Sequence, residues 1–207
     1  IWYVTDRGNE FNRLASLNLK TKKISYFTTD IPWEVSGYTL SKDKSKIAFE
    51  TNESGLNKMY LMDANSKKYS EIKGLPVGLV NNFEFTNDGK SLFFSQSTYD
   101  SSADIYRLDL ATNKIERWTD SEQGEMQKTD MSAPKLIEWK SFDDMKITGF
   151  YYPVSKKFTG KRPVLINIHG GPEGQSMASS LGSGNYYTNE MGVALIYPTV
   201  RGSSGFV

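Results

Sequence analysis

The feature that most constrains the fold of this chain is a sequence repeat in its first 120 residues. The same order of residue types (apolar, Asp or Asn, polar turn, Lys, apolar) occurs in segments 17–24, 62–69 and 108–115. The lysines that close these segments, Lys23, Lys68 and Lys114, are 45 and 46 residues apart. A repeat in constant phase indicates that one structural unit is used several times along the chain.

The same period recurs in strand-like segments. Segments 1–3, 47–49 and 92–94 begin 46 and 45 residues apart, and Asp43 and Asp88 each stand four residues before the second and third of them. In the second unit we expect four short strands, near 46–51, 58–62, 69–71 and 82–85, with turn-forming residues in the gaps. Four strands in about 45 residues are typical of a β-propeller blade. We therefore predict that residues 1–130 are the last blades of a β-propeller, fewer than three in number.

A propeller closes with roughly four to eight blades, so fewer than three leave sheet edges and apolar faces uncovered. We therefore expect further blades before Ile1, where the chain opens in a strand-like pattern without a start methionine. For the same reason we expect this chain to self-associate. A small open array of sheets that forms a domain by itself is the alternative interpretation.

The period stops after Asp120, and 121–132 is a polar linker. Segments 135–141 and 146–152 are predicted strands around a turn at 142–144. Segment 163–168 is nearly all apolar, as expected for a strand covered on both faces. A Gly- and Ser-rich stretch with a helical part near 186–191 leads to a second buried strand at 193–197. Strand, glycine turn, helix and strand form a βαβ unit, which implies a parallel sheet and hence an α/β domain.

A candidate for chemistry follows the first of these apolar strands, the sequence His169-Gly170-Gly171-Pro172. Acyl transfer needs hydrogen-bond donors directed at the oxygen that becomes negative, and glycine lets backbone N–H groups approach a substrate closely. In α/β-hydrolases one such donor lies in the loop after the third strand. The segment is therefore a candidate oxyanion loop, and a plain tight turn is the alternative.

Together with the later segment from Arg201 to Phe206 (RGSSGF), the HGGP segment resembles the prolyl oligopeptidase family, above all its acylaminoacyl-peptidase and dipeptidyl-peptidase-like branch. The resemblance covers the whole chain. It implies a mixed fold, in which propeller blades precede the N-terminal part of an α/β-hydrolase (peptidase) domain at 131–207. It also implies a serine peptidase whose propeller screens short peptide substrates by size. The N–H of Gly171 would be an oxyanion donor, His169 would shape that loop, and Arg201 and Gly202 would support the neighbouring turn.

The catalytic triad of such an enzyme is not in this sequence. The nucleophile motif Gly-x-Ser-x-Gly does not occur, and the segment Gly202–Gly205 is one residue short of it. His169 is the only histidine and lies upstream, whereas the triad order on this fold is Ser, Asp or Glu, His. Asp143 and Asp144 are available carboxylates, which we interpret as a hairpin turn. We therefore expect the triad beyond Val207 and no peptidase activity in this chain alone.

Composition excludes several classes of function. The chain has no cysteine, so disulfides, thiolate chemistry and Cys-based zinc sites are excluded, and we expect neither a metal nor a cofactor. The net charge of +1 favours no nucleic-acid partner, and no apolar run is long enough to cross a membrane. Two alternatives to a peptidase are a non-catalytic propeller of the TolB-like kind and an esterase of the HGGG type. The apolar HGGP strand argues against the first, and Pro172 in place of a third glycine argues against the second.

Overall fold

The computed structural model describes residues 1–171 and 173–204. The chain divides into two compact units. The first holds residues 1–76, 80–95 and 105–119; the second holds 77–79, 96–104 and the chain from Asp120 on. The predicted domain boundary between residues 130 and 131 stays a prediction. No helix among the described residues is long and apolar enough to cross a membrane.

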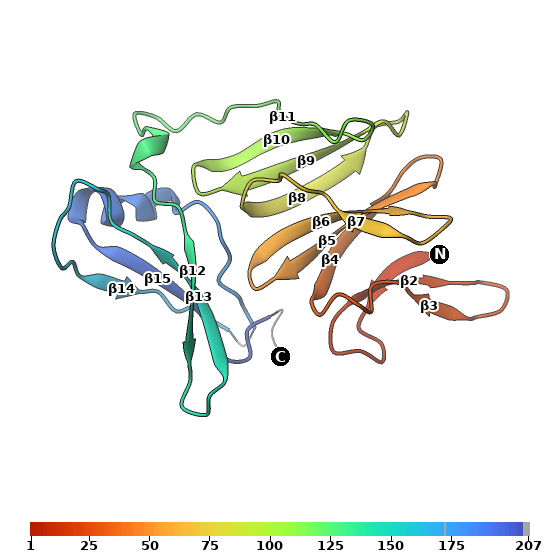
Figure 1. Cartoon of the computed structure of the whole chain (residues 1–207), viewed down its shortest axis with the longest axis horizontal. Helices are drawn as coiled ribbons and strands as arrows, with labels where there is room; N and C mark the ends of the chain where they lie inside the picture. The colour runs from red at the N-terminus through yellow and green to blue at the C-terminus, as the bar shows by residue number, and fades with distance from the viewer. Residues whose placement is uncertain (172, 205–207) are drawn as a thin grey trace. The chain divides into compact units, whose positions relative to one another are not determined.

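Strands dominate the first unit, and sequence neighbours pair side by side (Figure 1). The first sheet contains β1 (Trp2–Thr5), β2 (Arg13–Leu17) and β3 (Ile24–Tyr26). The second sheet contains β4 (Glu34–Leu40), β5 (Lys46–Glu53), β6 (Leu56–Asp63) and β7 (Tyr69–Glu71). The third sheet, most of which lies in this unit, contains β8 (Gly78–Phe85), β9 (Ser91–Thr98), β10 (Ser101–Asp109) and β11 (Ile115–Arg117).

The repeat in the sequence corresponds to a repeated turn. Asn18, Asp63 and Asp109 each accept, through one side-chain oxygen, the backbone N–H groups two and three residues later. These bonds hold the pKa of Asp63 and that of Asp109 below the usual value for a carboxyl group. Four residues after each of these side chains the backbone turns left-handed, with φ of 59°, 63° and 56° at Lys22, Lys67 and Asn113. The periodic polar residues are therefore turn formers.

A second repeated turn joins β4 to β5 and β8 to β9. The hydroxyls of Ser41 and Thr86 donate to Asp43 and Asp88, each at 2.6 Å. The Ser41 hydroxyl is the largest of the influences that lower the pKa of Asp43 to about 2. Because this local turn pairs β8 with β9, the strand expected at 82–85 begins the third sheet and is not the last strand of the second repeat unit, which corrects the prediction.

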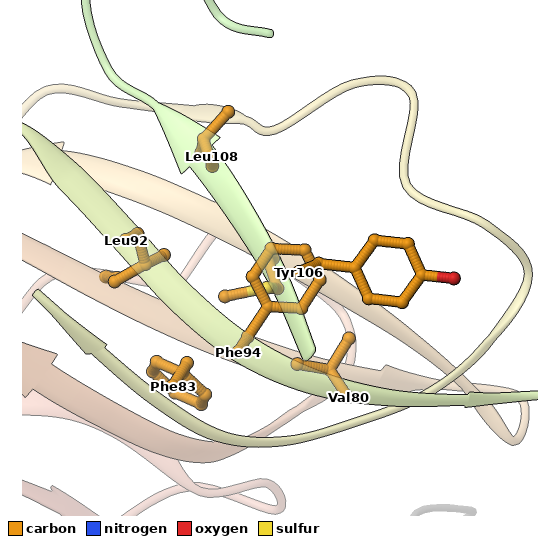
Figure 2. Close-up of a cluster of buried hydrophobic side chains, with 8 residues drawn as sticks. Val80, Phe83, Leu92, Phe94, Tyr106 and Leu108 are labelled. Atoms are coloured by element: carbon orange, nitrogen blue, oxygen red, sulfur yellow. The ribbon is translucent and has the colours of Figure 1, made fainter. Parts of the chain in front are cut away.

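Residues between neighbouring sheets form the core of the first unit. On β5, Ala48 belongs to one apolar cluster, while Ile47 and Phe49 belong to another. Side chains alternate between the two faces of a strand, so β5 is buried on both. Figure 2 shows the first cluster, in which the rings of Phe94 and Tyr106 stack with centroids 5.6 Å apart. These sheets therefore bury their faces against one another.

A further sheet, in the second unit, has the order β12 (Lys135–Lys140), β13 (Lys146–Tyr152), β15 (Ala194–Thr199), β14 (Val164–Ile166). The predicted hairpin is confirmed as the antiparallel pair β12–β13, and the predicted parallel pairing is confirmed between β14 and β15. Short helical segments are η1 (Lys128–Asp130), η2 (Gly182–Gly184) and η3 (Tyr187–Met191). The last confirms the expected helical stretch and ends at Met191, and its C-cap Gly192 has a φ of 63°.

One expectation for this sheet was wrong. We predicted that the apolar strand at 163–168 is covered on both faces, but Val164, Leu165 and Ile166 are 50%, 42% and 59% exposed. The strand lies at the sheet edge, and β15 is its one partner among the described strands. Its burial would need elements that the described residues do not supply. The second predicted buried strand is confirmed, since Ala194 and Leu195 are 2% and 1% exposed.

Candidate functional site

The predicted oxyanion loop begins where β14 ends. The backbone N–H of Asn167 donates to the carbonyl of Ile196 at 2.8 Å, which extends the parallel pairing toward His169. Gly170 and Gly171 are exposed, and their N–H groups donate no hydrogen bond within the described part of the chain. Two free donors at the carboxyl end of a strand suit the binding of a negatively charged oxygen. The oxyanion role stays a prediction, and Pro172 lies outside the described residues.

The structure brings together the two segments on which the family resemblance rests. His169 Nε2 lies 2.8 Å from Ser203 Oγ. Close by, the backbone N–H of Ser204 donates to the carbonyl of Gly174 at 2.9 Å. The loop after β14 is thus held at two points by the turn after β15. Gly205 and Phe206, which complete the RGSSGF segment, lie outside the described residues.

The contact between His169 and Ser203 has the atoms of a nucleophile–base pair but not its chemistry. Ser203 is 2% exposed, and its hydroxyl donates to the carbonyl of Val200. A catalytic base is normally oriented by a carboxylate, whereas Nδ1 of His169 lies 3.0 Å from the carbonyl oxygen of Gly170. A substrate cannot reach a buried hydroxyl that is already engaged. The contact therefore fixes the shape of the loop.

Arg201 connects the same turn to the β12–β13 hairpin. Its Nη2 donates to a carboxylate oxygen of Asp143 and, at 3.2 Å, to Ser141 Oγ. The guanidinium lies over the ring of Phe142, 5.1 Å from its centroid. The bond from Arg201 is the main cause that lowers the pKa of Asp143. Asp143 and Asp144 do lie in a hairpin turn, as interpreted from the sequence.

Two glycines have conformational reasons to be in this site. The predicted turn residue Gly202 has a φ of 74°, in the left-handed region that suits glycine. Gly174 was missed by sequence reasoning. A Cβ atom there would lie 2.6 Å from the carbonyl oxygen of Gly170 and 3.0 Å from His169 Nδ1. The signal was its position in a glycine-rich loop, but the close approach itself is a tertiary feature.

No group of three or more His, Asp and Glu side chains in the described segments is placed to hold a metal ion. The groups of the site that can interact with an anion are the backbone donors, the His169 imidazole and the Arg201 guanidinium. Such groups can stabilise negative charge on an oxygen, and none of them is an activated nucleophile.

No protein-family model matches this chain, and no curated protein matches it. Solved structures do match. A puromycin-hydrolyzing peptidase from Mycobacterium tuberculosis has a TM-score of 0.82 at 15% identity, over 99% of this chain and 32% of that one. Prolyl oligopeptidase B from Galerina marginata has a TM-score of 0.81 at 14% identity, over 98% of this chain and 28% of that one.

An acylaminoacyl peptidase from Pyrococcus horikoshii has a TM-score of 0.70 at 20% identity, over 95% of this chain and 29% of that one. At these identities the likeness shows a shared fold. The resemblance predicted from the sequence is confirmed at that level, because the matching structures include puromycin hydrolases, prolyl oligopeptidases and an acylaminoacyl peptidase. The chain spans about a third of the length of the structures that it matches.

Proposed function

We propose that this chain is the propeller-to-hydrolase segment of a serine peptidase of the prolyl oligopeptidase family, which cleaves short peptides through an acyl-enzyme. The observation that carries this proposal is the pair of free backbone N–H groups at Gly170 and Gly171, at the carboxyl end of a strand in a partly parallel sheet. Fold neighbours that match nearly the whole chain support it, since they are peptidases.

In the proposed reaction the Gly171 N–H donates to the oxygen of the scissile carbonyl. Charge builds on that oxygen as the tetrahedral intermediate forms, so a donor fixed in place beforehand stabilises the transition state more than the substrate. His169 positions the donor through its contact with Ser203, 2.8 Å away. The nucleophilic serine, its histidine base and the orienting carboxylate come from sequence after Val207 in this proposal.

The stacked sheets of residues 1–119 are, in the same proposal, blades of a β-propeller. Support comes from the period of about 45 residues, the four strands in each of the second and third sheets, and the burial of β5 on both faces. The sheet from β12 to β14 is the start of an α/β-hydrolase domain, and the propeller screens peptides by size. An isolated set of blades leaves sheet edges open, so residues 1–207 alone would self-associate.

The test uses the natural-length protein and the isolated chain 1–207. We expect the natural-length protein to hydrolyse a short chromogenic peptide and to be blocked by a serine-directed phosphonate, and the isolated chain to do neither. We also expect the gene to encode Gly-x-Ser-x-Gly roughly 30–50 residues after Val207, from the usual spacing of β-α-β units. A stop codon or an unrelated domain at that place would refute the peptidase proposal and favour a non-catalytic binding module.

A paired substitution tests the oxyanion role. Gly171→Pro removes the donor N–H, whereas Gly171→Ala keeps it. Loss of one oxyanion donor typically lowers kcat about 10²–10³-fold, so the proline variant should lose that much and the alanine variant far less. Equal kcat values in folded proline and alanine variants would show that this N–H is no oxyanion donor.

A further inference from the structure

The second unit contains a pocket that the proposed peptidase reaction does not use. Its volume is about 540 Å³, within the usual range for small-molecule sites. Its walls come from the predicted linker, from the loop after β13 and from the helical segment before Gly192. It shares no lining residue with the loop of His169, Gly170 and Gly171.

Two asparagines in this wall have hydrogen-bonding groups that pair with no described residue. Asn189 is 6% exposed, and neither its side-chain nitrogen nor its oxygen has a partner among the described residues. Asn185 is 3% exposed; its Nδ2 donates to the carbonyl of Gly182 at 3.2 Å, but its Oδ1 has no partner there. Asn185 precedes η3 and Asn189 lies within it, and both line the pocket. Unpaired buried amides are costly, and a polar ligand would relieve that cost.

The charges around the pocket are unbalanced. Lys157 and Glu190 neutralise each other in an ion pair at 3.1 Å. Asp130 accepts the backbone N–H of Gln127 at 3.2 Å, and no cation pairs with it in the described chain. Glu125 likewise makes no hydrogen bond or ion pair with any described residue. Two carboxylates without a counter-charge therefore border one pocket, which favours a positively charged ligand.

Apolar surface accompanies these charges. The side chains of Met126 and Tyr186 line the same pocket and are 37% and 61% exposed. A ligand that places a cation near Glu125 and Asp130 can therefore lay a short hydrocarbon stem against a thioether and an aromatic ring.

We propose that this pocket binds a primary ammonium group on a short apolar stem, the chemistry of a lysine side chain or of an alkyl diamine. An ammonium group has three donors and no acceptor, which suits two carboxylates and the amide oxygens of Asn185 and Asn189. The free Nδ2 of Asn189 needs an acceptor on the ligand, and the peptide carbonyl of a lysine residue supplies one. A lysine within a peptide can therefore pair with more of the pocket's hydrogen-bonding groups than a diamine can.

The binding test uses the natural-length protein and Nα-acetyl-lysine methylamide, followed by calorimetry. We expect saturable binding that weakens with added salt and disappears when the lysine Nε is acetylated. Putrescine is titrated in a second arm. Weaker binding of putrescine supports a peptide lysine as the source of the amine, and equal or tighter binding supports a free amine. No binding of either amine at millimolar concentration would overturn the proposal.

Substitutions then locate the binding. The double variant Glu125→Gln/Asp130→Asn should bind lysine methylamide about tenfold more weakly, because two exposed ion pairs contribute at most about that factor. The control Glu84→Gln/Glu122→Gln changes the net charge equally at exposed positions outside the pocket. Equal weakening in both variants would refute the site.

Asn189→Leu separates ligand binding from a structural role. Leucine has the same number of side-chain heavy atoms and the same branch point but no polar atoms, so it removes the unpaired groups without opening a cavity. We expect weaker binding together with an unchanged or higher melting temperature. Unchanged binding would refute the role of Asn189. Because affinity is read directly, these results stand whether or not the chain is part of a peptidase.

Discussion

The imidazole Nε2 of His169 lies 2.8 Å from Ser203 Oγ, although the two residues are 34 positions apart. Ser203 is fixed in turn, since its hydroxyl donates to the carbonyl of Val200. The loop after β14 therefore takes its position from the turn after β15. A loop that carries free N–H donors needs such support, because a donor contributes to catalysis only if it is held in place.

Ser203→Ala tests this support. The substitution leaves the carbonyl of Val200 and Nε2 of His169 without their partner, which should lower the free energy of unfolding by about 1 kcal/mol. For a domain of this size we expect a fall in the melting temperature of roughly 2–4 °C. Ser102→Ala is the control, because Ser102 is exposed on β10 and makes no side-chain hydrogen bond with described residues. Equal melting temperatures for the two variants would contradict the contact.

Arg201→Gln tests the second tie of the same turn. The Arg201 guanidinium lowers the pKa of Asp143, so its removal should return that pKa toward the ordinary value. A carboxyl group with a lowered pKa in the folded state stabilises the fold above its unfolded pKa. That contribution is lost as pH falls through the folded pKa. NMR titration of Asp143 in the wild type and in the variant measures the change. An unmoved Asp143 titration would show that the pair is absent in solution.

The parts of this fold that could be predicted are those set by local chemistry. Asn18, Asp63 and Asp109 form their turns with backbone groups two and three residues away, so the repeat is visible in the sequence. The β12–β13 hairpin is local in the same way. The pairing of β14 with β15 followed from the order of strand, glycine turn, helix and strand.

The parts that could not be predicted depend on distant neighbours. The side chains of β14 are exposed because no described element covers either face of the strand, which residue types do not reveal. The contact from His169 to Ser203 and the close approach at Gly174 arise only once the sheet is formed. The unpaired amide of Asn189 is likewise a product of packing, because an asparagine in a polar stretch looks solvent-exposed.

Lys44→Gly should stabilise the first unit. Lys44 has a φ of 61° in its turn, and the equivalent position of the next repeat is Gly89, with a φ of 66°. Relief of the left-handed strain is partly offset by the greater freedom of glycine in the unfolded chain. The free energy of unfolding should therefore rise by roughly 0.5 kcal/mol. Urea denaturation measures it. Lys42→Gly, in the same turn but without a positive φ, should instead lower stability, and the same sign for both would contradict the strain argument.

The surroundings of the Glu50 carboxyl group favour its neutral, protonated form. It lies on β5 between Gly37 and Met59 on the neighbouring strands, and Met59 is fully buried. Its Oε2 is buried and has no hydrogen-bond partner among the described residues. Loss of solvent contact raises the pKa of Glu50 to about 7. The folded state therefore holds a proton on Glu50 at a pH where the unfolded chain has lost it.

This raised pKa makes stability depend on pH. Between the unfolded pKa and about 7 the folded state binds more protons, so the Glu50 contribution to stability is full below that window and falls as pH rises through it. Glu50→Gln removes the charge. The free energy of unfolding of this variant should exceed that of the wild type by nearly zero at acidic pH and by at most about 3 kcal/mol above the window. Urea denaturation at a series of pH values measures the difference. Glu84→Gln, exposed on β8, is the control and should show no such growth. A difference between Glu50→Gln and wild type that stays constant with pH would mean that Glu50 is solvated in the folded protein.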